Sequence, residues 1–372
     1  MDIKNIIAAI SLSALVLILY SLFFAPPPPD LNEQKNKIEN TKNNSAISSP
    51  KIEKKVETKV ISRNSALDLS ERIKIENNNI IGSISLKGAI IDDLIFKKYT
   101  TELNSNQNVI LLNPTSMEEG YFVESGWSST DKNIELPNNS SIWTARGNNK
   151  LTPNNPVVLE WINKQGIIFT NTYQLDEKYL VKLNQKIENK SDSTFDFYPY
   201  AQIIRNTKPE VTNFYILHEG MLGVFNDELE EQDYDDINEK KFSVNSSDGW
   251  LGITDKYWIT ALVPDKNKNF KSEFEYENRY KANFIITDPY ESKPNQTVSN
   301  DIKIFVAAKE VEIIDGYAES ENINKFDLAI DWGWFYFFTK PLFFVIDYFF
   351  KLTGNFGIAI ILITACIRII FF

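Results

Sequence analysis

The sequence of 372 residues contains only one cysteine, Cys366, and only one histidine, His218. A single cysteine cannot form an intramolecular disulfide, so the fold does not depend on one. A single histidine excludes metal sites built from several histidines and catalysis that needs a histidine pair. We expect His218 to be an ordinary surface or strand residue, whereas Cys366 lies inside an apolar run.

Basic residues are also fewer than acidic ones. The sequence has 39 Lys and Arg residues and 50 Asp and Glu residues, which gives a net charge of −11. This balance argues against nucleic-acid binding, because neutralising phosphates needs a basic surface. The chain lacks a G-x-S-x-G nucleophile motif, a G-x-x-x-x-G-K phosphate loop and a cluster of metal ligands. We therefore expect no catalytic residues, no metal and no cofactor.

Long apolar runs are present at both ends of the chain. Residues 6–24 read IIAAISLSALVLILYSLFF, have no charged side chain and are about long enough to cross a ~30 Å hydrocarbon core. The only candidate cleavage site ends at Ala25, and Pro26 behind it makes it a poor substrate, so we predict an uncleaved signal anchor rather than a signal peptide. Residues 1–5 should stay cytoplasmic, because Lys4 and the amino terminus flank the anchor with positive charge.

A tether and a β-rich domain are expected between the two ends. Residues 25–61 begin with four prolines and continue with Asn, Lys, Glu and Ser, which predicts a tether that is first extended and then disordered. From about Arg72 onward apolar and polar residues alternate, as in half-buried strands separated by polar turns. We expect an antiparallel β-sandwich over residues 62–325, with Trp250 and Trp258 in its core rather than in a ligand platform.

Three local patterns make more specific predictions. The runs 157–161 and 167–173 flank Asn163-Lys164-Gln165-Gly166, which is a hairpin signal. Alternating apolar residues over 274–284 predict one long strand. Residues 227–239 hold the densest acidic run, and we interpret it as a solvated, self-repelling loop, because its spacing does not match an EF-hand calcium loop.

The segment 326–352 is dense in aromatics but also charged. Three charges share one stripe of a helix at spacings of seven and four: Lys340, Asp347 and Lys351. Pro341 suits only a first helical turn, so the helix should begin near Thr339. We expect this helix to lie in the membrane interface, with Trp332 and Trp334 at headgroup depth. The alternative is a buried helix of the water-soluble domain.

Residues 353–372 form a second candidate for spanning the membrane, interrupted only by Arg368. An arginine stays charged, so within a membrane it must meet water, a counter-ion or a partner. Near the cytoplasmic end its side chain could reach the headgroups, and in a water-filled cavity it could attract an acidic segment of a substrate. The residues alone favour the first of these interpretations.

Several segments resemble the YidC/Oxa-type family of membrane protein insertases. They are MDIKNIIAAI, GAIIDDLIFKKY, YFVESGW, GWLGITDKYWITALVPD, FVAAKEVEIIDGY and the C-terminal run FDLAIDWGWFYFFTKPLFFVIDYFFKLTGNFGIAIILITACIRIIFF. The likeness covers nearly the whole chain in order. It implies a periplasmic β-supersandwich similar to sugar mutarotases, then an interfacial helix, and then the first helix of a transmembrane core.

The resemblance also implies a function. In the family, one positive residue of that first core helix lies in a hydrophilic groove that receives the polar part of a nascent protein, and Arg368 matches that position. A cation in such a groove attracts acidic residues more strongly than one in water, so the resemblance reverses our interpretation of Arg368. The implied partners are nascent membrane proteins, the Sec translocon and the lipid bilayer. The implied role is that of an insertase and chaperone, with no chemical reaction, in the bacterial inner membrane as a multi-pass protein.

The sequence departs from the family pattern at its end. The family core has five transmembrane helices, whereas this sequence stops inside the first, so we expect a fragment that could not form the groove alone. The alternative function is a membrane-anchored periplasmic carbohydrate-binding β-sandwich. Mutarotase chemistry uses histidines that His218 alone cannot supply, so only sugar binding remains open. A docking scaffold for translocon partners is a third option, compatible with the insertase.

Overall fold

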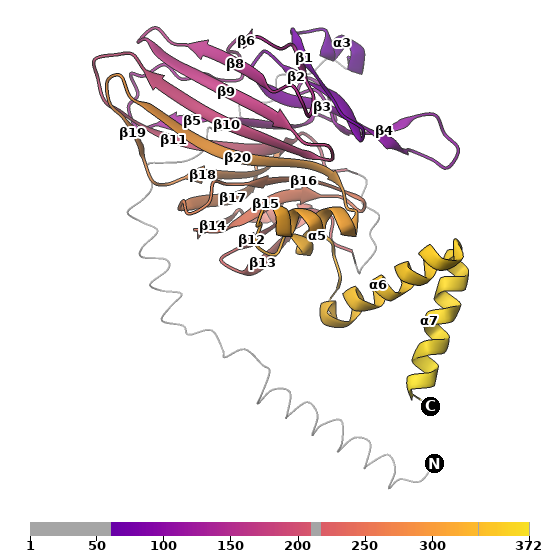
Figure 1. The fold of residues 1–372 in the computed structure, drawn as a ribbon. Coiled ribbons are helices and arrows are strands. Elements are labelled where there is room, and N and C mark those ends of the chain that lie inside the picture. The colour runs from indigo at the N-terminus through magenta and orange to yellow at the C-terminus, as the bar shows by residue number, and fades with distance from the viewer. Residues whose placement is uncertain (1–60, 210–216, 334, 372) are drawn as a thin grey trace, which may run out of the picture. The chain divides into compact units, whose positions relative to one another are not determined.

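The computed structural model describes residues 61–209, 217–333 and 335–371. The predicted anchor at residues 6–24 lies outside the described residues, as does nearly all of the predicted tether at 25–61. Two large β-sheets make up most of the described part (Figure 1).

The first sheet has eleven strands. They are β1 (Arg72–Glu76), β2 (Ile80–Ser85), β3 (Ile90–Thr100), β4 (Asn108–Leu112), β5 (Tyr121–Ser129), β7 (Lys150–Leu151), β11 (Phe195–Arg205), β14 (Phe242–Ser246), β17 (Phe270–Tyr276), β18 (Tyr280–Ile286) and β19 (Tyr290–Ser292). Their order is β14-β17-β18-β11-β5-β3-β2-β1-β7, with β19 paired to β11 and β4 paired to β3. The pairs are antiparallel except for β1 with β7, which are parallel.

The second sheet has nine strands. They are β6 (Thr144–Arg146), β8 (Val157–Ile162), β9 (Ile167–Leu175), β10 (Leu180–Asn189), β12 (Gly220–Phe225), β13 (Glu228–Asp233), β15 (Gly249–Thr254), β16 (Trp258–Val263) and β20 (Thr297–Ala308). Their order is β13-β12-β15-β16-β20-β10-β9-β8-β6. Every pair in this sheet is antiparallel.

The hydrophobic core lies between the two sheets. Every second residue of β9 is buried, because successive side chains of a strand point to opposite faces. The main core cluster draws on strands of both sheets, including Val123 and Ile203 from the first and Trp250 and Ile304 from the second. Burial of this apolar surface is the main force that holds the layers together. The predicted sandwich is confirmed and is antiparallel except for the pair β1 and β7, with Trp250 fully buried and Trp258 packed against the core.

Two of the three local predictions need correction. The predicted hairpin is present as β8 and β9, joined through Gly166 at a φ of +83°. The predicted long strand over 274–284 is wrong, because Asn278 has a φ of +61° and reverses the chain between β17 and β18. The predicted acidic loop at 227–239 is also wrong: it forms edge strand β13 and helix α4 (Tyr234–Glu239), because Tyr234 and Ile237 are buried.

Helices accompany the strands at both ends of the described chain. Besides α4 they are α3 (Arg63–Leu67), α5 (Val311–Ser320), the 3-10 helix η1 (Phe326–Ala329), α6 (Tyr336–Thr353) and α7 (Phe356–Phe371). Gly354, at a φ of +65°, ends α6, and its amide donates to the carbonyl of Phe350 at 2.7 Å. Among the described residues, no helix is both long and apolar enough to cross a membrane.

Helix α6 begins three residues before the position predicted from Pro341. The amides of Phe338 and Thr339 both donate to the carbonyl of Phe335, at 2.8 and 2.9 Å, so a helical turn already exists at Thr339. Pro341 therefore lies in the second turn and lacks the amide that would have bonded to the carbonyl of Phe337. The earlier start is held in place by hydrogen bonds of the first turn, from Tyr336 Oη to Asp327 Oδ2 and from Thr339 Oγ1 to the carbonyl of Trp332.

Candidate membrane-contact site

Helices α6 and α7 carry an unusual amount of exposed apolar surface. None of the α6 residues is buried. The large apolar side chains exposed on the two helices are Tyr336, Phe337, Phe338, Phe343, Phe344, Val345, Tyr348, Phe350, Leu352, Phe356, Ile358, Ile360, Ile361 and Ile369. Soluble domains rarely expose so many large apolar side chains on two consecutive helices, so this surface is a candidate for contact with lipid or protein.

The charged stripe of α6 contacts the helices that end the sandwich domain. Lys340 Nζ lies 3.0 Å from Asp315 Oδ1 on α5 and 2.9 Å from Asp327 Oδ2 on η1. Lys351 Nζ lies 2.5 Å from Glu312 Oε1 on α5 and 2.8 Å from Asp347 Oδ2 on α6. The predicted stripe therefore exists, and its two lysines tie α6 to α5 and η1.

The i,i+4 ion pair of Asp347 with Lys351 was predicted from the sequence and is present, but the acidic partners on α5 and η1 were not predicted. Glu312 and Asp315 are three positions apart and so lie on one face of α5, which was the only available signal. Asp327 gave no signal of its own, because its partners Tyr336 and Lys340 lie nine and thirteen positions further along the chain.

Asp327 is the centre of this junction. Its carboxylate accepts hydrogen bonds from Tyr336 Oη at 2.7 Å and Lys340 Nζ at 2.9 Å, and its backbone carbonyl accepts one from Trp332 Nε1 at 3.2 Å. Burial alone would raise the pKa of Asp327, but the hydrogen bonds from Lys340 and Tyr336 hold it below its usual value. The carboxylate therefore stays charged and keeps its donors.

Lys340 has the complementary electrostatic environment. Its side chain is 17% exposed. Burial alone would lower the pKa of Lys340, but hydrogen bonds to Asp327 and Asp315 raise it above the usual value. A partly buried lysine between two carboxylates is held more firmly than a surface ion pair, because less water competes for its charge.

Of the predicted interface tryptophans, the structure describes one. Trp332 is half-buried, donates its indole N–H to Asp327 and packs edge-on against Phe343, with ring centroids 5.6 Å apart. Its carbonyl accepts a hydrogen bond from Thr339 Oγ1 at 2.8 Å. Trp332 thus positions the start of α6, and its predicted place at headgroup depth stays a prediction. Trp334 lies outside the described residues.

Cys366 and Arg368 lie together on α7, whereas His218 lies in the sandwich domain. Arg368 is on the last turn of α7 with an exposed side chain, and Cys366 is half-buried on the same helix. His218 precedes β12, and its Nδ1 lies 3.1 Å from Asp233 Oδ1. The amide of His218 donates to Asp331 Oδ2 at 3.1 Å, so it also helps to hold the segment before α6. Within the described residues, no group of three or more His, Cys, Asp or Glu could bind a metal ion.

Comparison with known sequences gives one consistent result. Residues 72–345 match the family described as the YidC periplasmic domain. The chain is 54% identical over 375 residues to the membrane protein insertase YidC of Pelagibacter ubique, covering 100% of this chain and 66% of that protein. It is 38% identical over 381 residues to the insertase of Rickettsia bellii, with the same coverage. The chain thus spans 66% of the length of these two relatives.

Solved structures offer only a distant likeness. The galactose mutarotase related enzyme from Lactobacillus acidophilus is 12% identical, with a TM-score of 0.44, covering 64% of this chain and 97% of that one. A galactose mutarotase-like protein from Lactobacillus casei is 10% identical, with a TM-score of 0.43 and coverage of 64% and 100%. Identities and TM-scores this low do not support any conclusion about function.

Proposed function

Because this chain belongs to the YidC family of membrane protein insertases, we propose that the full-length protein inserts and folds integral membrane proteins in the bacterial inner membrane. The observation that carries this proposal is the 54% identity over the whole chain. The proposed partners are nascent membrane proteins, lipid and, for some clients, the Sec translocon. The family consists of insertases rather than enzymes, and the carbohydrate-binding alternative is not favoured.

In this proposal each part of the chain has a place relative to the membrane. Residues 6–24 are the anchor, 25–61 the tether and 62–325 the periplasmic sandwich. Residues 326–352 lie along the membrane surface, and 353–372 begin the transmembrane core.

The contacts of α6 support the proposed position of 326–352. Lys340 and Lys351 reach the acidic groups of α5 and η1, while aromatic side chains of α6 such as Phe337 and Tyr348 stay largely exposed. A helix with one face ion-paired to a water-soluble domain and another face apolar suits the boundary between water and lipid. The ion pairs would hold that apolar face at a constant angle to the periplasmic domain.

Arg368 is the residue that we propose to contact clients. Its guanidinium stays charged at any physiological pH, so in a polar groove of the complete core it would attract acidic segments that must cross the membrane. Charge alone should be sufficient for this role, so Arg368→Lys should retain most of the activity and Arg368→Ala should not.

The test is an insertion assay with the full-length protein in reconstituted vesicles. The clients are a matched pair that differ only in carrying acidic or neutral residues in the translocated segment. We expect Arg368→Ala to slow insertion of the acidic client about tenfold, with a much smaller effect on the neutral one. Arg146→Ala is the control, since Arg146 is an exposed arginine that pairs with Glu160 on the sandwich. If Arg368→Ala inserts the acidic client as fast as the wild type does, the proposed role of Arg368 is refuted.

A further inference from the structure

The first described helix is too short to be stable by itself. Helix α3 has five residues, and Ala66 is the only one of them that is buried. Isolated helices shorter than about 12–15 residues are marginal in water, so contacts outside the helix must hold α3 in place. Residues 62–70 contain α3 and join the predicted tether to β1, and we call them the strap.

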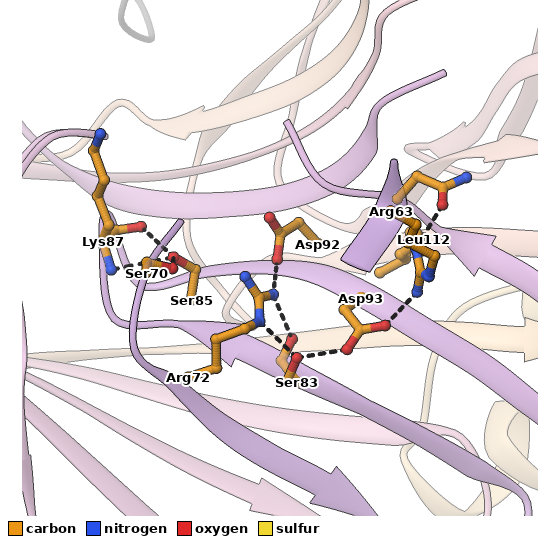
Figure 2. A network of polar contacts seen from close by, with 10 residues as sticks. Arg63, Ser70, Arg72, Ser83, Ser85, Lys87, Asp92, Asp93 and Leu112 are labelled. Carbon is orange, nitrogen blue, oxygen red and sulfur yellow. Dashed lines mark hydrogen bonds and ion pairs between the residues drawn. The ribbon is translucent and has the colours of Figure 1, made fainter. Parts of the chain in front are cut away.

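The side chain of Arg63 attaches the strap to two strands of the eleven-stranded sheet. Its Nη1 donates to the carbonyl of Leu112 at 3.2 Å and to Asn113 Oδ1 at 2.6 Å, and its Nη2 contacts Asp93 Oδ1. Figure 2 shows the contacts to Leu112 and Asp93, which lie on β4 and β3. The planar fork of an arginine can bind several acceptors at once, so Arg63 is the main anchor of the strap.

The other end of the strap is held by little. Ser70 Oγ lies 2.8 Å from Ser85 Oγ. The amide of Leu86 donates to the carbonyl of Glu71 at 2.9 Å, which marks where the chain joins the sheet. Most residues between Arg63 and Ser70 are exposed. The strap thus relies on Arg63 near one end and on a hydroxyl pair near the other.

The sheet beneath Arg63 keeps its own polar contacts without it. Asp93 Oδ2 accepts a hydrogen bond from Ser83 Oγ at 2.5 Å, and Ser83 Oγ accepts one from Arg72 Nε at 2.7 Å. Arg72 also forms an ion pair with Asp92, as Figure 2 shows. If Arg63 leaves, Asp93 therefore keeps a donor and has the positive charge of Arg72 one hydroxyl away. Release of the strap does not leave an isolated buried charge, which would be costly.

The attraction that holds Arg63 is partly cancelled. The side chains of Arg63 and Asp93 are 16% and 11% exposed, so both charges have lost much of their water. The pKa of Arg63 is lowered, mainly by burial and also by Arg72, although Asp93 and Asp92 act against this shift. Lost hydration offsets much of the Coulomb attraction in such a pair. The contact is therefore specific in geometry but modest in strength.

We propose that the strap is a releasable extension of the tether. While Arg63 is bound, the tether leaves the sandwich beside β4, and when Arg63 lets go, residues 62–70 join the tether. An extended chain spans about 3.3–3.6 Å per residue, so release lengthens the connection by about 30 Å. This lets the anchor move away along the membrane and make room for a client beside the core, while α6 still holds the sandwich. The inference rests on the proposed function, because the anchor, the tether and the clients belong to that proposal.

The first test is hydrogen exchange of the full-length wild type. The amides of Ala66 and Asp68 donate to the carbonyls of Ser62 and Asn64 at 2.9 and 3.0 Å. Corrected for intrinsic rates, they should exchange at least about tenfold faster than the amides of β2, because the strap opens while the sheet stays folded. Equal protection of α3 and β2 would overturn the proposal, since the strap would then open only when the sheet unfolds.

Variants of Arg63 test the anchor itself. Arg63→Met keeps an apolar stem but removes the fork, so α3 should exchange about tenfold faster with β2 unchanged. Arg63→Lys should lie between the two, because an ammonium group does not match three acceptors as the fork does. Arg146→Met is the control, since Arg146 is an exposed arginine paired with Glu160. Unchanged exchange of α3 in Arg63→Met would overturn the proposal, as would an equal rise in β2.

Two spin labels measure the lengthening in vesicles. In a Cys366→Ser background, labels are attached at Ser21→Cys in the predicted anchor and at Lys164→Cys, where the lysine side chain is 88% exposed on the sandwich. Arg63→Glu places a like charge beside Asp93, so the released state should dominate. Pulsed electron resonance should then show distances that extend by up to about 30 Å beyond those of the parent. An unchanged distance distribution, with β2 still protected, would refute the extension.

The two proposals fail separately. Hydrogen exchange of α3 does not depend on the anchor or on insertion, so its failure removes the strap and leaves the insertase proposal unaffected. Loss of the insertase proposal in the vesicle assay would not change the exchange rates of α3.

Discussion

Replacing Lys340 by methionine should release the start of α6 from the sandwich domain without unfolding that domain. Methionine keeps most of the length of the side chain but removes the charge that lies between Asp315 and Asp327. The apolar stem can still pack, so the change isolates the electrostatic part of the junction.

The expected magnitude follows from the burial of the three groups. Exposed ion pairs contribute about 0–1 kcal/mol, and breaking a fully buried pair costs about 3–5 kcal/mol. The side chains of Lys340, Asp315 and Asp327 are 17%, 27% and 17% exposed, which is between these limits. We therefore expect a loss of about 1–2 kcal/mol, which corresponds to a factor of about 5–30 in the equilibrium between docked and released states.

Hydrogen exchange followed by mass spectrometry measures this equilibrium directly. Amides of η1 and of the first two turns of α6 should exchange about 5–30 times faster in Lys340→Met, whereas amides of β10 in the sandwich should not change. Lys293→Met is the control, because its ion pair with Glu291 is about half exposed on both sides. Unchanged exchange in η1 and α6 would refute the view that Lys340 holds the junction.

The same junction has a defined pH dependence. The pKa of Asp327 is lowered in the folded state, so its contribution is present above the unfolded value near 3.8 and is lost as the pH falls through the folded value. The pKa of Lys340 is raised, so its contribution is present below about 10.5 and is lost as the pH rises further. Protection of α6, corrected for intrinsic exchange, should thus be constant between about pH 5 and 10, fall in acid below about pH 4, and fall again in base above about pH 10.5.

Two further predictions concern the stability of the sandwich, measured by urea denaturation. Trp250→Ala should cost about 3–5 kcal/mol, because Trp250 is fully buried and packs edge-on against Phe326; Trp250→Phe should cost clearly less, since the indole N–H has no partner among the described residues. Asn278→Val should cost about 1–2 kcal/mol because the φ of +61° disfavours a β-branched residue, whereas Asn278→Gly should be neutral or slightly stabilising. Equal stability of the two variants within either pair would contradict the explanation given for that position.

Local patterns in the sequence were enough to predict the class of fold and many of its strands. The two-residue period marks which side chains face a core, since a strand places alternate residues on opposite faces, and the hairpin of β8 and β9 followed from its turn residues. The same reasoning failed at Asn278, because apolar residues recur at every second position on both sides of this turn. The pattern therefore reads as one strand although the chain reverses. It failed again at residues 227–239, where two buried residues outweigh the repulsion among the surrounding acidic side chains.

The sequence determined the amphipathic strands, the charged stripe of α6 and membership of the insertase family. Only the tertiary structure decided which strands are neighbours, and so brought Asp93 and Leu112 together around Arg63 at separations of 30 and 49 residues. It also brought Lys340 to Asp315. The physical reason is that a local period specifies the face of an element but not its partner, which depends on long-range burial of apolar surface.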